Sequence, residues 1–168
     1  MLLNHFKTSD INIAELGVAQ SASLKMFREY FKHANIDVFD NDNNLIEKSK
    51  KLQLNKVNYF HLDVNNKNNI KDLFEKNNIL YDLIIDDTSH LFDHQINIVE
   101  ETHKFLKKGG FLIIEDVFVK KKNYREKLYY EKLKHLKNKF TDIFFCECKH
   151  KYNYSGFWNN SKLLIFKK

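Results

Sequence analysis

Five short apolar runs alternate with segments whose apolar residues recur at helical spacing, and this alternation constrains the fold more than any other feature of the sequence. The runs predict strands at 11–16, 36–40, 57–63, 81–86 and 111–116. The segments between them predict helices at 23–33, 43–53, 69–78 and 94–108, the last of which ends at Gly109 and Gly110. Apolar runs without polar alternation are typical of parallel strands covered by helices on both faces. We therefore predict a Rossmann-like, doubly wound α/β sheet.

The C-terminal part adds a basic helix at 124–139 and two further apolar runs at 142–148 and 162–167. These two runs predict an antiparallel hairpin at the edge of the sheet, which brings the expected total to seven strands, mostly parallel. The chain of 168 residues has no Pro, no internal repeat and no linker-like stretch. We expect one domain that spans residues 1–168 and buries a sizeable core.

Positive charge is concentrated in the C-terminal third of the chain. Residues 119–168 hold 14 Lys and Arg against 4 Asp and Glu, whereas residues 1–118 hold 14 against 18. A basic region of this kind can attract an anionic substrate, a nucleic acid or a membrane surface. A solvated, Lys-rich helix face is the more common explanation of such a pattern.

Two observations bear on where the protein resides. No apolar run approaches the roughly 18–20 residues that a membrane span needs, and the N-terminus lacks a basic region followed by an apolar core. Cys146 and Cys148 are the only cysteines, which favours reduced thiols over a zinc site or a disulfide framework. We expect a cytoplasmic protein without a membrane span.

Acidic residues stand at the end of every one of the first five predicted strands. They are Glu15, Asp40 with Asp42, Asp63, Asp86 with Asp87, and Glu115 with Asp116. A single acid in such a place is commonly the cap of the following helix. Open α/β sheets, however, bind ligands beyond the carboxyl ends of their strands, so five acidic ends predict a binding cleft there.

Two of these strand ends indicate a nucleotide-like cofactor. Asp40 follows the second predicted strand, where nucleotide-binding sheets place an acid that accepts hydrogen bonds from ribose hydroxyls. Glu15, Leu16 and Gly17 form the turn from the first predicted strand into a helix, and a glycine there lets the backbone approach a cofactor closely.

Three stretches resemble motifs of class I S-adenosylmethionine-dependent methyltransferases. NIAELGVAQSASLKMFREYF resembles their first motif, and the closest likeness is to a branch that includes macrocin-type sugar O-methyltransferases and cephalosporin-hydroxylase-like proteins. IIDDTSHLFDHQ resembles the Asp-Asp-Gly-Ser-His motif of that branch after the fourth strand, and KKGGFLIIEDV resembles the Gly-Gly turn and Glu-Asp end of its fifth strand. The resemblance covers nearly the whole chain and implies S-adenosylmethionine as cofactor.

The resemblance also implies roles for individual residues. It assigns Glu15, Gly17, Ser21 and Ser23 to the methionine end of the cofactor site, Asp40 to the ribose, and Asp63 to the adenine. It assigns Asp87, Glu115 and Asp116 to a divalent metal, expected to be Mg²⁺. Asp86 is expected beside the cofactor or as a further metal ligand, and His90 as the general base that deprotonates the acceptor. A cation held by carboxylates can acidify a hydroxyl, so both groups suit O-methylation.

The implied reaction is O-methylation of a small hydroxylated molecule, with a sugar or sugar nucleotide first and a phosphorylated metabolite second. A homo-oligomer can supply the substrate contacts that a minimal chain lacks. A nucleic-acid methyltransferase or binding module is an alternative, although no Asn-Pro-Pro-Tyr-like element follows the fourth strand. A catalytically silent partner protein is another, because Ser21 and Ala22 replace the Gly pair of the family, and Val38 and Thr88 replace two further glycines.

Overall fold

A computed structural model describes residues 3–117, 124–147 and 162–168, and within them it contains one seven-stranded sheet. The strand order is β3-β2-β1-β4-β5-β7-β6. The strands are β1 Asn12–Leu16, β2 Asn35–Asp40, β3 Val57–His61, β4 Tyr81–Asp86, β5 Leu106–Ile114, β6 Asp142–Glu147 and β7 Lys162–Lys167. Strands β1 to β5 are parallel, whereas β7 is antiparallel to both β5 and β6. The predicted fold class is confirmed. Cys148 and the greater part of the connection between β6 and β7 lie outside the described residues.

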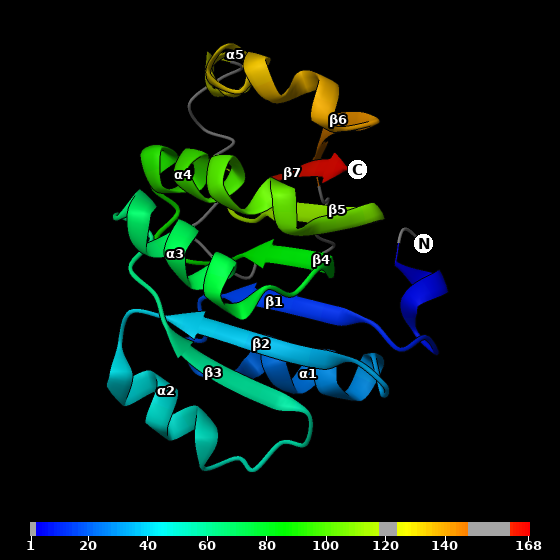
Figure 1. The fold of residues 1–168 in the computed structure, drawn as a ribbon, viewed down its shortest axis with the longest axis vertical. Helices are drawn as coiled ribbons and strands as arrows, with labels where there is room; N and C mark the ends of the chain where they lie inside the picture. Colours follow the sequence, from blue (N-terminus) through cyan, green and yellow to red (C-terminus); the bar gives the residue numbers. More distant parts are fainter. Residues whose placement is uncertain (1–2, 118–123, 148–161) are drawn as a thin grey trace.

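Helices cover both faces of the sheet (Figure 1). The α-helices are α1 Ala22–Tyr30, α2 Asn43–Lys50, α3 Lys67–Asn77, α4 Phe92–Thr102 and α5 Tyr124–Lys132. Short 3₁₀ helices are η1 Asn4–Phe6, η2 His103–Phe105 and η3 Lys134–Lys139. Within the described ranges, no helix is both long enough and apolar enough to cross a membrane.

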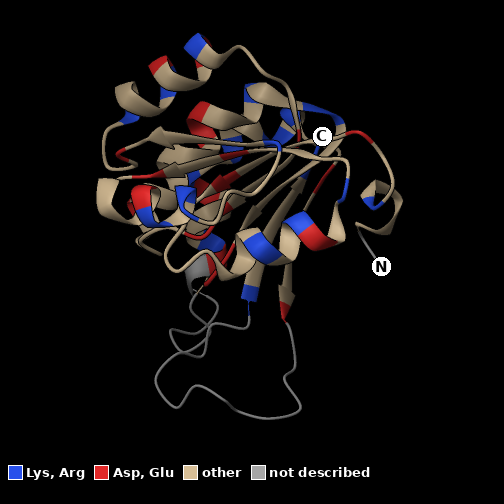
Figure 2. Ribbon diagram, turned by 90° about the horizontal axis from the view of Figure 1, so that it is seen from below, with Lys and Arg blue, Asp and Glu red and all other residues tan. Residues whose placement is uncertain are grey.

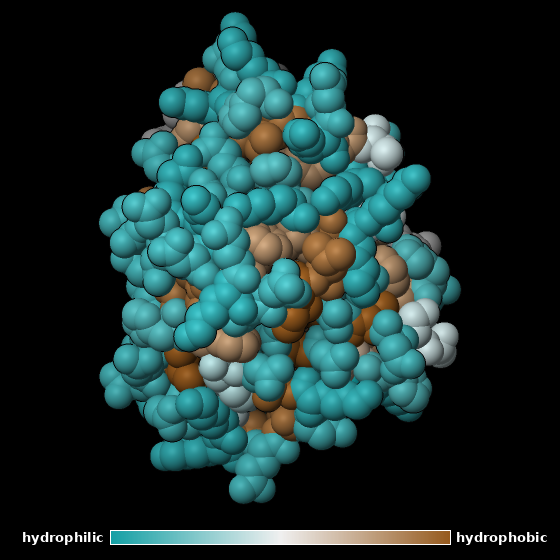
Figure 3. Space-filling model, in the orientation of Figure 1, coloured by the Kyte–Doolittle hydropathy of each residue, from teal (hydrophilic) through white to brown (hydrophobic). Residues whose placement is uncertain are grey.

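Two apolar clusters form the core, one on each face of the sheet. The first includes Phe74 of α3, Val99 of α4 and Tyr129 of α5, and the second includes Leu24 and Phe27 of α1. Successive residues of a strand point to opposite faces, so each central strand contributes to both clusters. Figure 3 shows that the surface on the α3 and α4 side is mainly hydrophilic, with apolar side chains exposed near the centre of this face.

The predicted helix 94–108 is wrong in its C-terminal part. Helix α4 ends at Thr102, and residues from Leu106 onward belong to β5. The reason is pairing across the sheet: the Gly109 amide donates to the Lys168 carbonyl oxygen at 2.6 Å, and the Lys168 amide donates to the Gly110 carbonyl oxygen at 3.0 Å. The two glycines therefore belong to a strand and do not end the helix. The predicted helix 124–139 likewise continues only to Lys132 and is followed by η3.

Part of the positive charge of the C-terminal third is paired internally. The buried Lys162 ammonium contacts Glu126 of α5 and Glu147 of β6, the latter at 3.0 Å, and Lys127 lies 3.8 Å from Glu131. Figure 2 shows Lys and Arg on several helices and strand ends. Within the described chain, some lysines of the C-terminal third are therefore neutralised by neighbouring glutamates.

A buried carboxylate lies inside the sheet, away from the acidic strand ends. Asp37 of β2 is 3% exposed, and its oxygens accept hydrogen bonds from the Tyr81 hydroxyl at 2.7 Å and the Asn58 amide at 2.8 Å. Burial of a carboxylate is costly unless such donors surround it. Tyr81 is thus both a core aromatic and the donor that makes Asp37 tolerable.

We expect Tyr81→Phe to lower the free energy of unfolding by roughly 1–3 kcal/mol, because Asp37 loses a buried hydrogen-bond donor. Urea denaturation followed by circular dichroism measures the change. Tyr130→Phe is the control, since Tyr130 is 48% exposed and the loss of its hydroxyl should change stability by less than about 0.5 kcal/mol. Equal stability of both variants would contradict the role given to Tyr81.

Candidate functional site

A cavity of about 290 Å³ lies at the carboxyl ends of the parallel strands. It lies at the reversal of strand order between β1 and β4, where open α/β sheets bind ligands. Residues from the turns after β1 to β4 line it, among them Gly17, Asp40, Leu62, Asp63, Asp87 and His94. Of the five acidic strand ends, those with Asp40, Asp63 and Asp87 therefore line this cavity, whereas Glu15, Glu115 and Asp116 are not among its lining residues. A larger cavity of about 620 Å³ lies between α5, η3 and the β6–β7 pair, but Asp142 is the one acidic group among its lining residues.

The turn after β1 is built so that its backbone touches the turn after β4. Gly17 has a φ of +95°, and its amide donates to the Phe39 carbonyl oxygen at 2.7 Å. A Cβ atom at Gly17 would lie only 2.1 Å from the Asp87 carbonyl oxygen. Both the conformation and the close approach require glycine here.

Asp40 stabilises the loop that follows Gly17 through hydrogen bonds. Its two carboxylate oxygens accept hydrogen bonds from the Val18 and Asp42 amides, each at 2.8 Å, while the side chain also lines the cavity. The Ser21 amide donates to the Val18 carbonyl oxygen at 2.7 Å, and Ser21 has a φ of +61° just before α1. Ser21 thus occupies a left-handed conformation that glycine would adopt at lower cost.

Glu15 and Ser23 contact each other beneath the cavity. The Ser23 hydroxyl donates to Glu15 Oε1, and Glu15 is fully buried, with no hydrogen-bond partner for Oε2 among the described residues. The pKa of Glu15 is raised to about 7, mainly by burial. The hydrogen bond from Ser23 opposes this shift, whereas the charges of Asp87 and Glu115 contribute to it. Both residues lie behind the turn and are not among the lining residues of the cavity.

Asp86 is held by the residue that follows the acidic pair. Asp86 is 1% exposed, and its Oδ1 accepts hydrogen bonds from the Thr88 amide at 3.1 Å and the Thr88 hydroxyl at 2.7 Å. Burial raises the pKa of Asp86 to about 6, against the effect of these two bonds. The Thr88 side chain, which stands where the family resemblance leads one to expect glycine, is therefore used as a hydrogen-bond donor.

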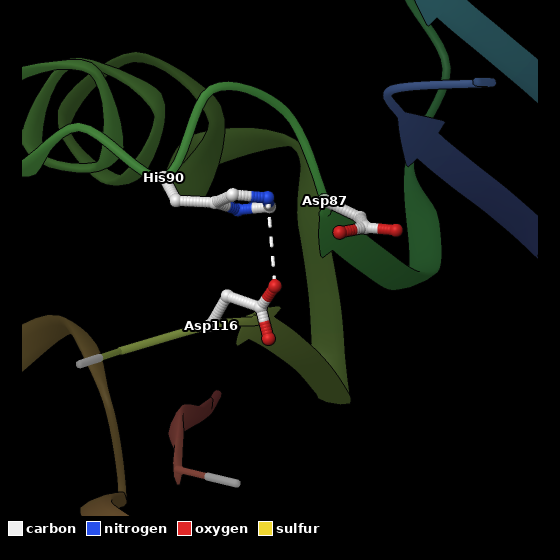
Figure 4. Close-up of side chains that lie close together, drawn as sticks. All are labelled: Asp87, His90 and Asp116. Atoms are coloured by element: carbon white, nitrogen blue, oxygen red, sulfur yellow. Dashed lines mark ion pairs between the residues drawn. The ribbon is translucent and has the colours of Figure 1, made fainter. Parts of the chain in front are cut away.

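Two acids and one histidine come together at the edge of the cavity (Figure 4). They are Asp87, Asp116 and His90, and we call this set the acidic trio. One potential ligand atom from each lies within 4.8 Å of the other two. His90 Nε2 lies 3.5 Å from Asp116 Oδ2, while the buried His90 Nδ1 has no hydrogen-bond partner in the described part of the chain. The segments that bring them together start from the ends of β4 and β5.

The electrostatics of the acidic trio suit a cation. Burial raises the pKa of Asp87, and Asp116 raises it further, whereas His90 lowers it. Glu115 lies outside the trio, but burial and the charges of Asp87 and Asp116 raise its pKa to about 7. Carboxylates that repel one another beside a buried, unpartnered nitrogen can be relieved by a divalent ion. The residues present therefore fit a metal site.

Several cavity residues were not singled out from the sequence. Leu45, Leu62 and Val64 provide apolar walls, and Ser89 provides a hydroxyl. His94 Nδ1 lies 2.7 Å from Ser89 Oγ, and its Nε2 lies 3.2 Å from Asn65 Oδ1. Position in the sequence could have indicated them, since Leu62, Val64 and Ser89 lie a few residues beyond strand ends.

No protein-family model and no curated protein sequence matches this chain. Solved structures do resemble it. The MycE methyltransferase from the mycinamycin pathway, in complex with Mg and S-adenosylhomocysteine (SAH), superposes with a TM-score of 0.67 at 16% identity over 99% of this chain. This chain spans 47% of MycE.

Two other methyltransferases show the same likeness. An rRNA methylase from Streptococcus thermophilus gives a TM-score of 0.68 at 12% identity, covering 99% of this chain and 92% of its own. The plantazolicin methyltransferase BpumL, in complex with SAH, gives 0.65 at 16% identity, covering 99% and 79%. The chain therefore shares its fold with these methyltransferases.

The free energy of unfolding of the metal-free protein should fall as the pH rises from about 4.5 to about 7. The pKa of Glu15 is raised from its ordinary value of 4.5 to about 7, so the folded state keeps a proton that the unfolded chain has released. The state that binds more protons loses stability as the pH rises. Urea unfolding across this range should show a shallower slope for Glu15→Gln than for the wild type. Glu29→Gln, on the exposed side of α1, should keep the wild-type slope. An unchanged slope in Glu15→Gln would contradict the assignment.

Proposed function

We propose that this protein is an S-adenosylmethionine-dependent O-methyltransferase that uses a divalent cation, Mg²⁺, and acts on a hydroxyl of a small acceptor, a sugar or sugar nucleotide. The observation that carries the proposal is the acidic trio beside a cavity at the strand-order reversal of a methyltransferase fold. The trio combines cation-binding oxygens with an imidazole, which are the two aids a poorly acidic hydroxyl needs.

Asp87 and Asp116 would hold the cation, with Glu115 as a further carboxylate whose charge interacts with both. When bound, a divalent cation polarises a hydroxyl oxygen and makes its proton easier to lose. Burial raises the pKa values of Asp87 and Glu115, and neighbouring carboxylates raise both further, so a cation between them would be stabilised by these groups. Asp86 is committed to Thr88 through Oδ1, and its role is to hold the turn that presents Asp87.

His90 would act as the general base. Its Nε2 lies 3.5 Å from Asp116 Oδ2, and imidazole is the side chain best suited to accept a proton in catalysis. His90 would take the hydroxyl proton as the acceptor oxygen is methylated, and S-adenosylmethionine would supply the methyl group from its sulfonium, which becomes a neutral thioether. Methyl transfer is an in-line displacement, so the remaining task of the chain is to align the two reactants.

The cofactor would lie in the cavity of about 290 Å³. S-adenosylmethionine supplies the methyl group. Gly17 would allow its methionine end to approach the β1 turn, with Ser21 in the same loop and Ser23 and Glu15 behind it. Asp40 would accept hydrogen bonds from the ribose, since each of its oxygens has a second lone pair. Asp63 would lie by the adenine.

The choice of a small acceptor is supported by MycE, whose structure contains Mg, SAH and mycinamycin VI. A nucleic-acid substrate is the alternative favoured by the basic C-terminal third and by the likeness to an rRNA methylase. A catalytically silent protein is favoured by the left-handed Ser21. Binding of SAH and the salt dependence of RNA binding distinguish the three proposed functions.

Titration calorimetry with SAH, in Mg²⁺ and in chelator, should show saturable binding with one site per chain. Gly17→Ala is the matched variant and should lose this binding, because its Cβ would displace the Asp87 backbone. Absence of binding by the wild type in both conditions would overturn the proposal and favour the silent protein. RNA binding that weakens steeply with salt, without SAH binding, would favour the nucleic-acid module.

His90→Ala should lower the rate of methyl transfer to an accepted sugar nucleotide by about 10²–10⁴-fold, because the proton acceptor is lost. The affinity for SAH should stay within about twofold of the wild type, since His90 is not a lining residue of the cavity. Release of SAH measures the rate, and His61→Ala, at an exposed position in β3, is the control. Full activity of His90→Ala would remove the role given to this residue.

A further inference from the structure

Gln95 is a buried amide on the face of α4 that packs against the sheet. It is 1% exposed, and buried Ile96, Ile98 and Val99 follow it. Its Nε2 donates to the Glu115 carbonyl oxygen at 3.1 Å, and its Oε1 accepts from the Tyr129 hydroxyl of α5. A carbonyl oxygen can only accept, so the amide group must face Glu115 and the tyrosine must donate. Both ends of the side chain therefore connect α4 and α5 to the end of β5.

This contact acts on the backbone that carries Asp116. Asp116 has a φ of +55°, a left-handed conformation that is unfavourable for a residue with a side chain and persists only where the surroundings fix it. On one side of Asp116, the Glu115 amide donates to the Asp86 carbonyl oxygen at 2.9 Å, and the Glu115 carbonyl oxygen accepts from Gln95. On the other side, the Val117 amide donates to the Lys162 carbonyl oxygen at 3.0 Å.

Two of these anchors lead to α5. Tyr129 belongs to α5 and orients Gln95. Lys162, whose carbonyl oxygen holds Val117, contacts Glu126 of α5 through its ammonium group. Helix α5 thus supports the peptide groups before and after Asp116, although it supplies no member of the acidic trio.

We propose that Gln95, held by Tyr129, is a positioning residue that fixes the Asp116 carboxylate beside His90 and Asp87 and thereby sets the affinity of the acidic trio for a divalent cation. The inference rests on the proposed function, because it assigns the support of the cation site used there. Groups that orient metal ligands from outside change metal affinity by about 10–100-fold when removed. Gln95 acts in this way through the backbone of Glu115.

Titration of the full chain with Mn²⁺, with the free ion counted by electron paramagnetic resonance, tests the proposal. Gln95→Met keeps the length of the side chain but removes the donor, and it should weaken Mn²⁺ binding by about tenfold. Tyr129→Phe should weaken binding by a smaller factor, because Gln95 loses its orienting partner. Thr102→Val is the matched control, since Thr102 is a buried residue of the same helix that donates to the Ile98 carbonyl oxygen at 2.7 Å, away from the trio. It should bind Mn²⁺ as the wild type does.

A second readout in metal-free protein separates this inference from the proposed function. The ring resonances of His90, followed by NMR, should move in Gln95→Met and Tyr129→Phe but not in Thr102→Val, because the position of Asp116 relative to His90 changes. A wild type that binds no Mn²⁺, together with moved His90 resonances, would refute the proposed cation and keep the positioning role. Unmoved resonances in both variants would overturn the positioning role, whether or not Mn²⁺ binds. If Gln95→Met fails to fold, Tyr129→Phe decides the outcome.

Discussion

The contact between Gly17 and the Asp87 carbonyl oxygen is the constraint on which the rest of the site depends. It joins the turns after β1 and β4 at the place where the strand order reverses, and no side chain fits between them. The Asp87 amide adds a hydrogen bond to the Leu16 carbonyl oxygen at 2.8 Å. Because the two turns are locked together, Asp87 keeps a fixed place both in the wall of the cavity and in the acidic trio.

Around this contact the chain buries several carboxyl groups. Glu15, Asp86 and Glu115 all have raised pKa values, and in each case burial is the main cause. A core built for stability alone would place apolar residues at these strand ends, because an uncompensated carboxylate opposes folding. Such an arrangement opposes folding and is consistent with the cation site that we propose.

Much of the fold could be predicted because it depends on periodicity. The alternation of runs indicated every described strand, and the acids after strands such as β2 and β4 marked the edge where the cavity lies. The end of α4 could not be predicted, because Gly109 and Gly110 pair with Lys168, which is distant in sequence. The same limit applies to the site. The sequence indicated that Glu15 and Asp87 would be near a cleft, but not that Ser23 would bond Glu15.

The position of β7 has a consequence for the order in which the protein can form during synthesis. β7 follows β6 in the chain but lies between β5 and β6 in the sheet. Until the ribosome has released Lys162–Lys167, β5 presents an open edge and β6 has no strand to pair with. The first five strands can therefore assemble early. The acidic trio can be completed only after β7 has formed, because α5 and β7 both support the backbone around Asp116. An unfinished chain would thus have a sheet before it has a complete site.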